Sequence, residues 1–334
     1  MSLHITKLQK RLCNVLQDGL PIRARPFADL GKLLETDEKT ALEETRQLKE
    51  RGVIKRIGTM INHRALGMTS TLVTGHVPEE ALEEVAEAVN ALKNVSHNYI
   101  RKHNLNLWFT LQGESQEQID IEVSKLSGRF GIDFYSLPVE RVFKLDVRFD
   151  AEGEGQPSGD TQQVPKSEIF ELNDTEKQIL SKLQDEIEVT ERPFHFLCGA
   201  GIEIDEVLNT IKNLIDKGVI RRLGAVVDHR KLGFVANVLF CCEVQQERII
   251  EAGKKLARFG IVSHCYERKR VKNWPYNLFA MMHGRSMVDI QHVIDKFTKA
   301  EGIESFELLP TEAELKKEPV RYVRLPREPS GRSQ

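Results

Sequence analysis

A histidine, a tyrosine, an arginine and a lysine recur at one fixed spacing in two distant parts of the chain. The strings are His97, Tyr99, Arg101 and Lys102 in the first part, and His264, Tyr266, Arg268 and Lys269 in the second. Guanidinium and ammonium groups bind carboxylates through charge-assisted hydrogen bonds, and arginine can do so in bidentate fashion. Histidine titrates near neutrality and suits proton transfer. Such a string is suited to holding an anion and moving a proton.

A second motif shows that the strings belong to two copies of a whole domain. Residues 52–67 and 218–233 lie 166 positions apart, and nine of their sixteen aligned residues are identical without a gap. A self-match at this period indicates domain duplication and not a short solenoid repeat. The polar residues that recur are Arg56, His63 and Arg64, and Arg222, His229 and Arg230. For His63 and His229, a catalytic role and a structural role between two subdomains both stay open.

Composition bounds the class of protein. A length of 334 residues favours two or a few more domains, with 40% hydrophobic and 29% charged residues, as in ordinary globular chains. The net charge of −2 gives no general electrostatic reason to bind a polyanion. No apolar run is long enough to span a membrane, and the N-terminus lacks a signal-peptide core. The five cysteines form an odd set without a Cys-x-x-Cys pair, so we expect no disulfide framework or thiolate metal site, and a reduced, cytoplasmic protein.

The elements that must position these residues follow one order in both halves. In the first half, helical periodicity over 6–17, a helix after Pro26 and a helix from Thr36 or Asp37 precede a strand at 53–57. Three helices followed by a small hairpin are typical of a winged helix-turn-helix. Next come, in order, a strand over 71–77, a helix from Pro78, strands over 95–101 and 105–111, a helix over 116–130 and a strand over 134–142. This βαββαβ order is that of a ferredoxin-like sheet with both helices on one face.

The same plan recurs in the second half. It predicts helices over 176–183, after Pro193 and before Gly218, then strands over 235–244, 262–268, 276–282 and 305–309, with helices near 247–259 and 287–300. We therefore predict an α+β tandem repeat of a winged helix-turn-helix plus a ferredoxin-like (βαββαβ) domain. The predicted segments are 1–68, 69–149, the linker 150–166, 167–234 and 235–325. The polar linker is long enough for the two sheets to pair within one chain as a pseudo-dimer. The tail after Pro319 is expected to be loose.

A winged helix before a ferredoxin-like sheet resembles the Lrp/AsnC family of transcription regulators. In that family the third helix enters the major groove, where cations contact phosphates. Here residues 37–51 carry five acids against four bases, and residues 202–217 carry four acids against two bases. Repulsion from phosphate opposes any gain, so we expect no specific DNA binding.

Three strings carry a closer resemblance, to the siroheme decarboxylases, a branch of the Lrp/AsnC fold. They are GVIRRLGAVVDHRKLGF at 218–234, VSHNYIRKHNLNLWFTL at 95–111 and WPYNLF at 274–279. The resemblance covers nearly the whole chain apart from the linker and the tail. It implies an enzyme, a carboxy-lyase, that converts siroheme to didecarboxysiroheme for the alternative heme pathway or for d-type heme. In that family the work is done by two homologous subunits or by one fused chain.

The resemblance also implies roles for the repeated residues. His97 and His264 would deliver the proton that replaces carbon dioxide. The remaining cations and aromatics would bind the carboxylate-ringed macrocycle: Arg56, Arg64, Tyr99, Arg101, Lys102, Trp108, Arg222, Arg230, Tyr266, Arg268, Lys269, Trp274 and Tyr276, with Phe109 and Phe279 as further stacking candidates. The arginines would hold spectator carboxylates, because clamping the reacting one would stabilise the ground state. No cofactor or protein-bound metal is required, because the macrocycle accepts the electrons and the iron enters with the substrate.

Two other functions stay open at this stage. One is an Lrp/AsnC-type regulator that senses heme or a small ligand, and the other is a tetrapyrrole carrier without chemistry. The halves also differ: the first has His103 in its turn, whereas the second has Arg270, Lys272 and an inserted Trp274-Pro275. We therefore expect two unequal pockets, and the sequence leaves open which one is catalytic.

Overall fold

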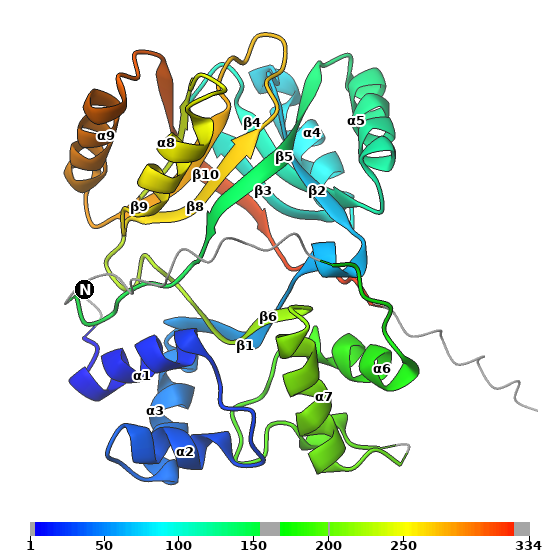
Figure 1. Cartoon of the computed structure of the whole chain (residues 1–334), viewed down its shortest axis with the longest axis vertical. Helices are drawn as coiled ribbons and strands as arrows, with labels where there is room; N and C mark the ends of the chain where they lie inside the picture. Colours follow the sequence, from blue (N-terminus) through cyan, green and yellow to red (C-terminus); the bar gives the residue numbers. More distant parts are fainter. Residues whose placement is uncertain (1–3, 154–167, 200, 324–334) are drawn as a thin grey trace, which may run out of the picture.

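The chain folds into a helical layer and a strand-rich layer, seen below and above in Figure 1. The computed structural model describes residues 4–153, 168–199 and 201–323. Both halves of the repeat contribute to both layers. In the described ranges, the helices are all too short or too polar to cross a membrane.

The helical layer contains the two helix-turn-helix units. The first consists of α1 (Lys7–Asp18), α2 (Pro26–Leu33) and α3 (Glu38–Glu50); the second consists of α6 (Asp174–Leu183), the 3₁₀ turn η3 (His195–Leu197) and α7 (Ile204–Asp216). Matching capping boxes start α1 and α6, with Thr6 and Asn173 as N-caps. The expected helix after Pro193 is wrong. Only the short turn η3 forms there, and the positive φ angles of Gly199 and Gly201 that follow are not helical.

A two-stranded ribbon joins the units. β1 (Ile54–Ile61) and β6 (Ile220–Val227) pair antiparallel across the two halves. The expected hairpin within each half is therefore wrong. Pairing with the partner half satisfies the backbone groups of each strand, and side chains such as Ile57 and Leu223 enter one apolar core shared by both units.

The strand-rich layer contains two ferredoxin-like units, which confirms the predicted fold class. The first has η1 (His63–Leu66), β2 (Thr69–Gly75), η2 (Glu79–Ala81), α4 (Leu82–Ala91), β3 (Val95–Arg101), β4 (Leu107–Gly113), α5 (Gln116–Phe130) and β5 (Phe134–Leu145). The second has β7 (Ala236–Cys242), α8 (Ile249–Ala257), β8 (Val262–Arg268), β9 (Leu278–Gly284), α9 (Met287–Glu301) and β10 (Phe306–Lys317).

The two sheets close into one barrel within the chain. β5 pairs with β8 and β10 pairs with β3, so the strand order is β10-β3-β4-β2-β5-β8-β9-β7. The helices α4 and α5 cover one sheet and α8 and α9 cover the other (Figure 1). A separate apolar cluster, which includes Trp108, Leu137 and Leu309, fills the inside of the barrel.

Strand alternation decides which repeated residues face into the barrel. Asn98 on β3 bonds Asn90 of α4, and Cys265 on β8 packs in the core under α8. Their neighbours therefore point the other way, inward. The inward set is His97, Tyr99 and Arg101 on β3, and His264, Tyr266 and Arg268 on β8.

The segments after β5 and β10 dock on the helical layer. Gln17 of α1 exchanges two hydrogen bonds with the backbone of Phe149, and Gln184 after α6 accepts from the backbone of Tyr322. The chain after Pro319 is thus packed as far as residue 323, so the expectation of a loose tail is wrong for these residues. Residues 150 and 151, assigned to the linker, are buried against α1. Most of the linker lies outside the described residues.

Candidate functional site

Two arginines lie buried inside the barrel, and neither has an acidic partner among the residues that the structure describes. Arg101 and Arg268 are 5% and 9% exposed. Each donates from Nη1 to a backbone carbonyl of the opposite half, Arg101 to Leu309 at 2.8 Å and Arg268 to Leu137 at 2.7 Å. In both, Nε is buried and has no hydrogen-bond partner in the described part of the chain. Burial lowers the pKa of each guanidinium to about 10. Such uncompensated cations are suited to an anionic ligand.

Tyrosine rings separate these arginines from the histidines. Arg101 lies 5.3 Å from the centre of the Tyr99 ring, and Arg268 lies 5.0 Å from that of Tyr266. His97 and His264 pack on the far side of Tyr99 and Tyr266, with ring centres 6.1 and 5.9 Å apart. The order histidine, tyrosine, arginine therefore runs along the barrel wall.

His97 and His264 are partly buried and held by the preceding serines. The Ser96 hydroxyl lies 2.8 Å from His97 Nδ1, and the Ser263 hydroxyl lies 3.0 Å from His264 Nδ1. Irregularities of register at 95–97 and 262–264 let serine and histidine side chains meet although they are adjacent in sequence. Burial lowers the pKa of His97 to about 4 and that of His264 to about 3. Nearby cations lower the His264 pKa further, Arg221 foremost.

The cations around the two tyrosines differ. Next to burial, which raises the pKa of both, the charges acting on Tyr266 are those of Arg268, Arg221 and Arg64. Neither Arg64 nor Arg221 forms an ion pair within the described residues. Around Tyr99, Arg101 and Arg230 are joined by the acid Glu314, which is itself paired with Lys317. Lys55, the counterpart of Arg221, pairs with Asp228 at 3.8 Å. Of the two histidine sites in the barrel, the one around His264 is therefore the more cationic.

His63 and His229 lie where the helical layer meets the barrel. Burial lowers the pKa of each to about 4. The His63 ring stacks on Tyr322, and the His229 ring stacks on Phe149 and contacts His283. Their Nε2 atoms are buried without a partner in the described chain. A structural or a chemical role remains compatible with this placement.

Several residues at this junction were missed from the sequence: Arg221, His283, Phe149 and Tyr322. Arg221 and His283 have Lys55 and Gln112 as counterparts, so neither stands out in the sequence as a repeated residue. Phe149 and Tyr322 carry a signal that was available. Val147-Arg148-Phe149 recurs as Val320-Arg321-Tyr322, and each arginine pairs with an aspartate at or just after the end of the first helix of its half: Asp18, the last residue of α1, or Asp185, two residues after α6.

Other expected binding residues lie elsewhere. Arg56 and Arg222 sit on the β1–β6 ribbon, where burial lowers the pKa of both, and Arg222 donates to the Met60 sulfur. Lys102 and Lys269 are exposed at the strand ends far from the histidines. Within the described residues, no group of histidine, cysteine and acidic side chains is placed to hold a metal ion.

The expected aromatic wall is not next to the histidines. Trp108 is fully buried in the barrel core, and Phe109 faces the helix-covered core on the other side of the sheet. Neither presents a face to a ligand, so the expected stacking role is wrong for these two. Trp274 packs edge-on against Trp108 at 5.3 Å, and Tyr276 packs on Trp274.

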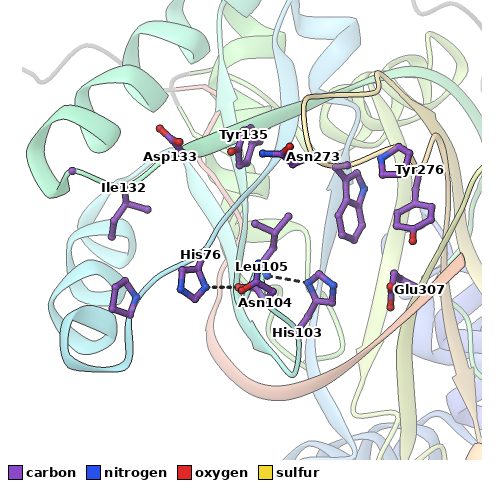
Figure 2. Close-up of a pocket in the computed structure, with 14 residues that line it drawn as sticks. His76, His103, Asn104, Leu105, Ile132, Asp133, Tyr135, Asn273, Tyr276 and Glu307 are labelled. Atoms are coloured by element: carbon purple, nitrogen blue, oxygen red, sulfur yellow. Dashed lines mark hydrogen bonds between the residues drawn. The ribbon is translucent and has the colours of Figure 1, made fainter.

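Trp274 and Tyr276 instead line a pocket away from the histidines; Figure 2 shows Tyr276 beside it. It has a volume of about 500 Å³, and His76, His103 and Tyr135 also face it. His103 is six residues beyond His97, which corresponds to about 20 Å of extended chain. The pocket contains the acids Asp133 and Glu307, and no lysine or arginine lines it. It is therefore chemically unsuited to a ligand rich in carboxylates.

The histidine end of the barrel can do three things chemically. Its arginines can bind several carboxylates, its rings can pack on an apolar body, and its histidines can exchange protons. Burial, and after it the nearby cations, lowers the pKa of both histidines, so these rings are neutral at pH 7, and a bound anion would shift both pKa values upward.

Comparison with known proteins finds a matching family model for the helical layer and another for the strand-rich layer. The model of the siroheme decarboxylase NirDL-like HTH domain matches residues 9–55 and 176–221, and that of the AsnC-like ligand binding domain matches residues 65–144 and 231–316. The siroheme decarboxylase of Hydrogenobacter thermophilus is 34% identical over 316 residues, covering 93% of this chain and 94% of the relative. The siroheme decarboxylase NirDL subunit of Paracoccus denitrificans is 29% identical, covering 86% and 88%.

A solved structure also matches almost end to end. The crystal structure of the siroheme decarboxylase NirDL is similar with a TM-score of 0.71 at 30% identity, and covers 95% of both chains. The same protein in complex with an iron-uroporphyrin III analogue gives 0.70 over the same share.

Proposed function

This chain belongs to the siroheme decarboxylase family, and we infer from that membership that it is an enzyme that removes carboxyl groups from siroheme. We propose that it acts as a carboxy-lyase on two acetate side chains and releases didecarboxysiroheme. The observation that supports this most directly is the pair of buried arginines, Arg101 and Arg268, which have no acidic partner among the described residues and lie one tyrosine ring away from the histidines. A carboxylate-ringed macrocycle supplies the missing anions.

Of the two histidine sites, the one around His264 is the better place for the substrate. Arg64, Arg221 and Arg268 surround Tyr266 without an ion pair among the described residues. Around His97, Asp228 and Glu314 already neutralise Lys55 and Lys317. Because binding there would leave these acids close to substrate carboxylates, we place siroheme toward His264, with Arg101 reaching from inside the barrel.

Loss of carbon dioxide breaks the bond between the carboxyl carbon and the ring methylene. The electron pair of that bond passes into the macrocycle and returns to form a C–H bond with an added proton. We propose that His264 gives this proton. Burial lowers the pKa of His264 most, and Arg221 and Arg268 lower it further; bound carboxylates would offset these two cations and so raise the pKa. The reacting acetate lies away from the arginines, which hold spectator carboxylates.

No organic cofactor is needed in this scheme, and the iron enters as part of the substrate. Specific DNA binding is not part of it either. In α3, Arg46 bonds the carbonyl of Val189 and Lys49 pairs with Glu186, so cations that would face phosphate already contact the protein. All five cysteines are free thiols, which fits the reducing, cytoplasmic setting that we propose.

Anaerobic incubation with siroheme tests the proposal. Mass spectrometry should show a product lighter by two carbon dioxides. Tetrapyrrole binding without any change of mass would instead make the chain a carrier. Tight, salt-sensitive and sequence-specific binding to the DNA upstream of its own operon, in place of turnover, would make it a regulator.

A further inference from the structure

A chain of hydrogen bonds runs from Arg101 to His264 across both halves of the barrel. Its links, in order, are Arg101 Nη1 to Thr311 Oγ1 at 3.1 Å, Thr311 Oγ1 to Asn237 Oδ1 at 3.3 Å, Asn237 Nδ2 to His283 Nε2 at 3.3 Å, His283 Nδ1 to Ser263 Oγ at 3.1 Å, and Ser263 Oγ to His264 Nδ1 at 3.0 Å. Five strands, β3, β10, β7, β9 and β8, contribute to it.

The Arg101 guanidinium and the orientation of the Asn237 amide together set the direction of these hydrogen bonds. A guanidinium can only donate, so Thr311 Oγ1 accepts from Arg101 and its own proton is available for Asn237 Oδ1. The Asn237 amide nitrogen then donates to His283 Nε2. Neutral His283 must therefore carry its proton on Nδ1, from which it donates to Ser263. In this series of hydrogen bonds, each donor and each acceptor is used once.

Ser263 carries this direction to His264. Because its oxygen accepts from His283, its hydroxyl proton is free for His264 Nδ1 or for the Met281 carbonyl, which lies 3.2 Å away. When His264 is neutral, its Nδ1, which is nearer than the Met281 carbonyl, accepts the hydrogen bond from this hydroxyl, and His264 then bears its own proton on Nε2. When His264 becomes an imidazolium, the hydroxyl can turn to the Met281 carbonyl and accept from Nδ1–H. A proton therefore stays on Nε2 in both charge states.

Among the described residues, the equivalent positions that would lead from Arg268 to His97 do not form such a series of hydrogen bonds. Thr311 pairs with Arg101 as Val139 pairs with Arg268, so the counterpart of Thr311 has no hydroxyl. Asn237 and His283 occupy the sheet positions of Ser70 and Gln112. Ser96 still contacts His97, but in the described residues nothing sets the direction of that bond.

We propose that Thr311, Asn237, His283 and Ser263 are positioning residues that make His264, and not His97, the proton donor. This rests on the proposed function. In the step itself, the Nε2–H bond of the His264 imidazolium breaks and the electron pair left by carbon dioxide forms the new C–H bond. His264 is then left neutral with its remaining proton on Nδ1, and it regains the resting Nε2–H form by taking up a solvent proton on Nε2 and releasing the one on Nδ1. The charges that face His264 are Arg221 on β6, His97 on β3, Arg268 on β8 and Lys317 on β10.

The first experiment reads the tautomers without substrate. Long-range ¹H–¹⁵N correlation spectra of the ¹⁵N-histidine-labelled full chain, assigned with H283Q and H264Q, should show His283 as the Nδ1–H form and His264 as the Nε2–H form. T311V removes the hydroxyl that accepts from Arg101 and donates to Asn237, so the signals of His283 and His264 should both shift toward the opposite tautomers. S96A should leave them unchanged. If His283 carries its proton on Nε2 in the parent, the proposal is overturned whether or not the protein decarboxylates siroheme.

The second experiment connects the chain to turnover. T311V and H283Q should bind siroheme with the parent affinity in absorbance titrations, but lose about 10- to 100-fold in kcat, the scale of a misplaced catalytic group. T311S restores the hydroxyl and should recover most of that loss. S96A, the matched change in the other half, should retain the parent kcat. Equal losses in T311V and S96A, or a parental kcat in both T311V and H283Q, would overturn the assignment to His264.

Discussion

Arg268 should weaken the fold and strengthen substrate binding at the same time. Its pKa lies at about 10 in the folded chain against an ordinary 12.5. Because a tenfold change in acidity corresponds to about 1.4 kcal/mol, the charged guanidinium destabilises the fold by about 3 kcal/mol. The folded pKa is the lower one, so this cost is fully present at pH 7 and disappears only as the pH rises above about 10.

The substitution Arg268→Met removes the charge and keeps most of the volume. It also removes the hydrogen bond to the Leu137 carbonyl, which contributes about 1 kcal/mol. We therefore expect the free energy of unfolding to rise by about 1–2 kcal/mol. Siroheme affinity should fall by about 10- to 100-fold, since a hydrogen bond to a charged group contributes about 1.5–3 kcal/mol.

Urea unfolding followed by tryptophan fluorescence measures the first effect, because both tryptophans lie in the barrel core. Absorbance titration with siroheme measures the second. Arg129→Met, which removes an exposed cation from α5, is the control and should change stability by less than about 0.5 kcal/mol. A variant at Arg268 that is less stable than the parent and binds siroheme equally well would refute the reasoning.

Three further outcomes are expected. His264→Ala should keep siroheme binding and lose about 10²–10⁴ in turnover, whereas His97→Ala should lose much less; equal losses in single-turnover assays would contradict the assignment. Acid should destabilise the free chain between pH 6.5 and about 4, because His63, His97 and His229 have folded pKa values of about 4, below their ordinary value, so the unfolded chain takes up the protons first. Denaturation midpoints across that range, with and without siroheme, should show the loss and its reversal by substrate. Gly224→Ala should lower the unfolding free energy by about 1–3 kcal/mol, since its Cβ would meet the Leu16 backbone oxygen at 2.5 Å; Gly58→Ala, which meets a movable Arg56 side chain, should cost less in the same urea assay.

The sequence predicted the features that repeat and missed those that depend on the difference between the halves. The spacing of Gly52 and Gly218 revealed the duplication, and alternation along 95–101 and 262–268 placed histidine, tyrosine and arginine on one face. The pairing of β1 with β6 was missed because a single apolar strand does not say which strand it joins. The repeat of Val147-Arg148-Phe149 as Val320-Arg321-Tyr322 was a signal for Tyr322, but it does not say that this ring packs on His63, which is far away in sequence. Trp108 was assigned to a ligand although aromatic residues more often fill a core.

The series of hydrogen bonds from Arg101 to His264 gives a physical reason for having two unlike copies of the domain in place of two identical ones. A homodimer with twofold symmetry must place the same residue at both copies of a position. Thr311 could then not face Arg101 unless threonine also replaced Val139 beside Arg268. Divergence of the two copies lets Thr311, Asn237 and His283 differ from Val139, Ser70 and Gln112, so the site around His264 can hold a directed donor that the site around His97 does not need. Because both sites still share the strands of one closed barrel, the unequal site costs no separate core, and the residues that differ are free to diverge further without opening the sheet.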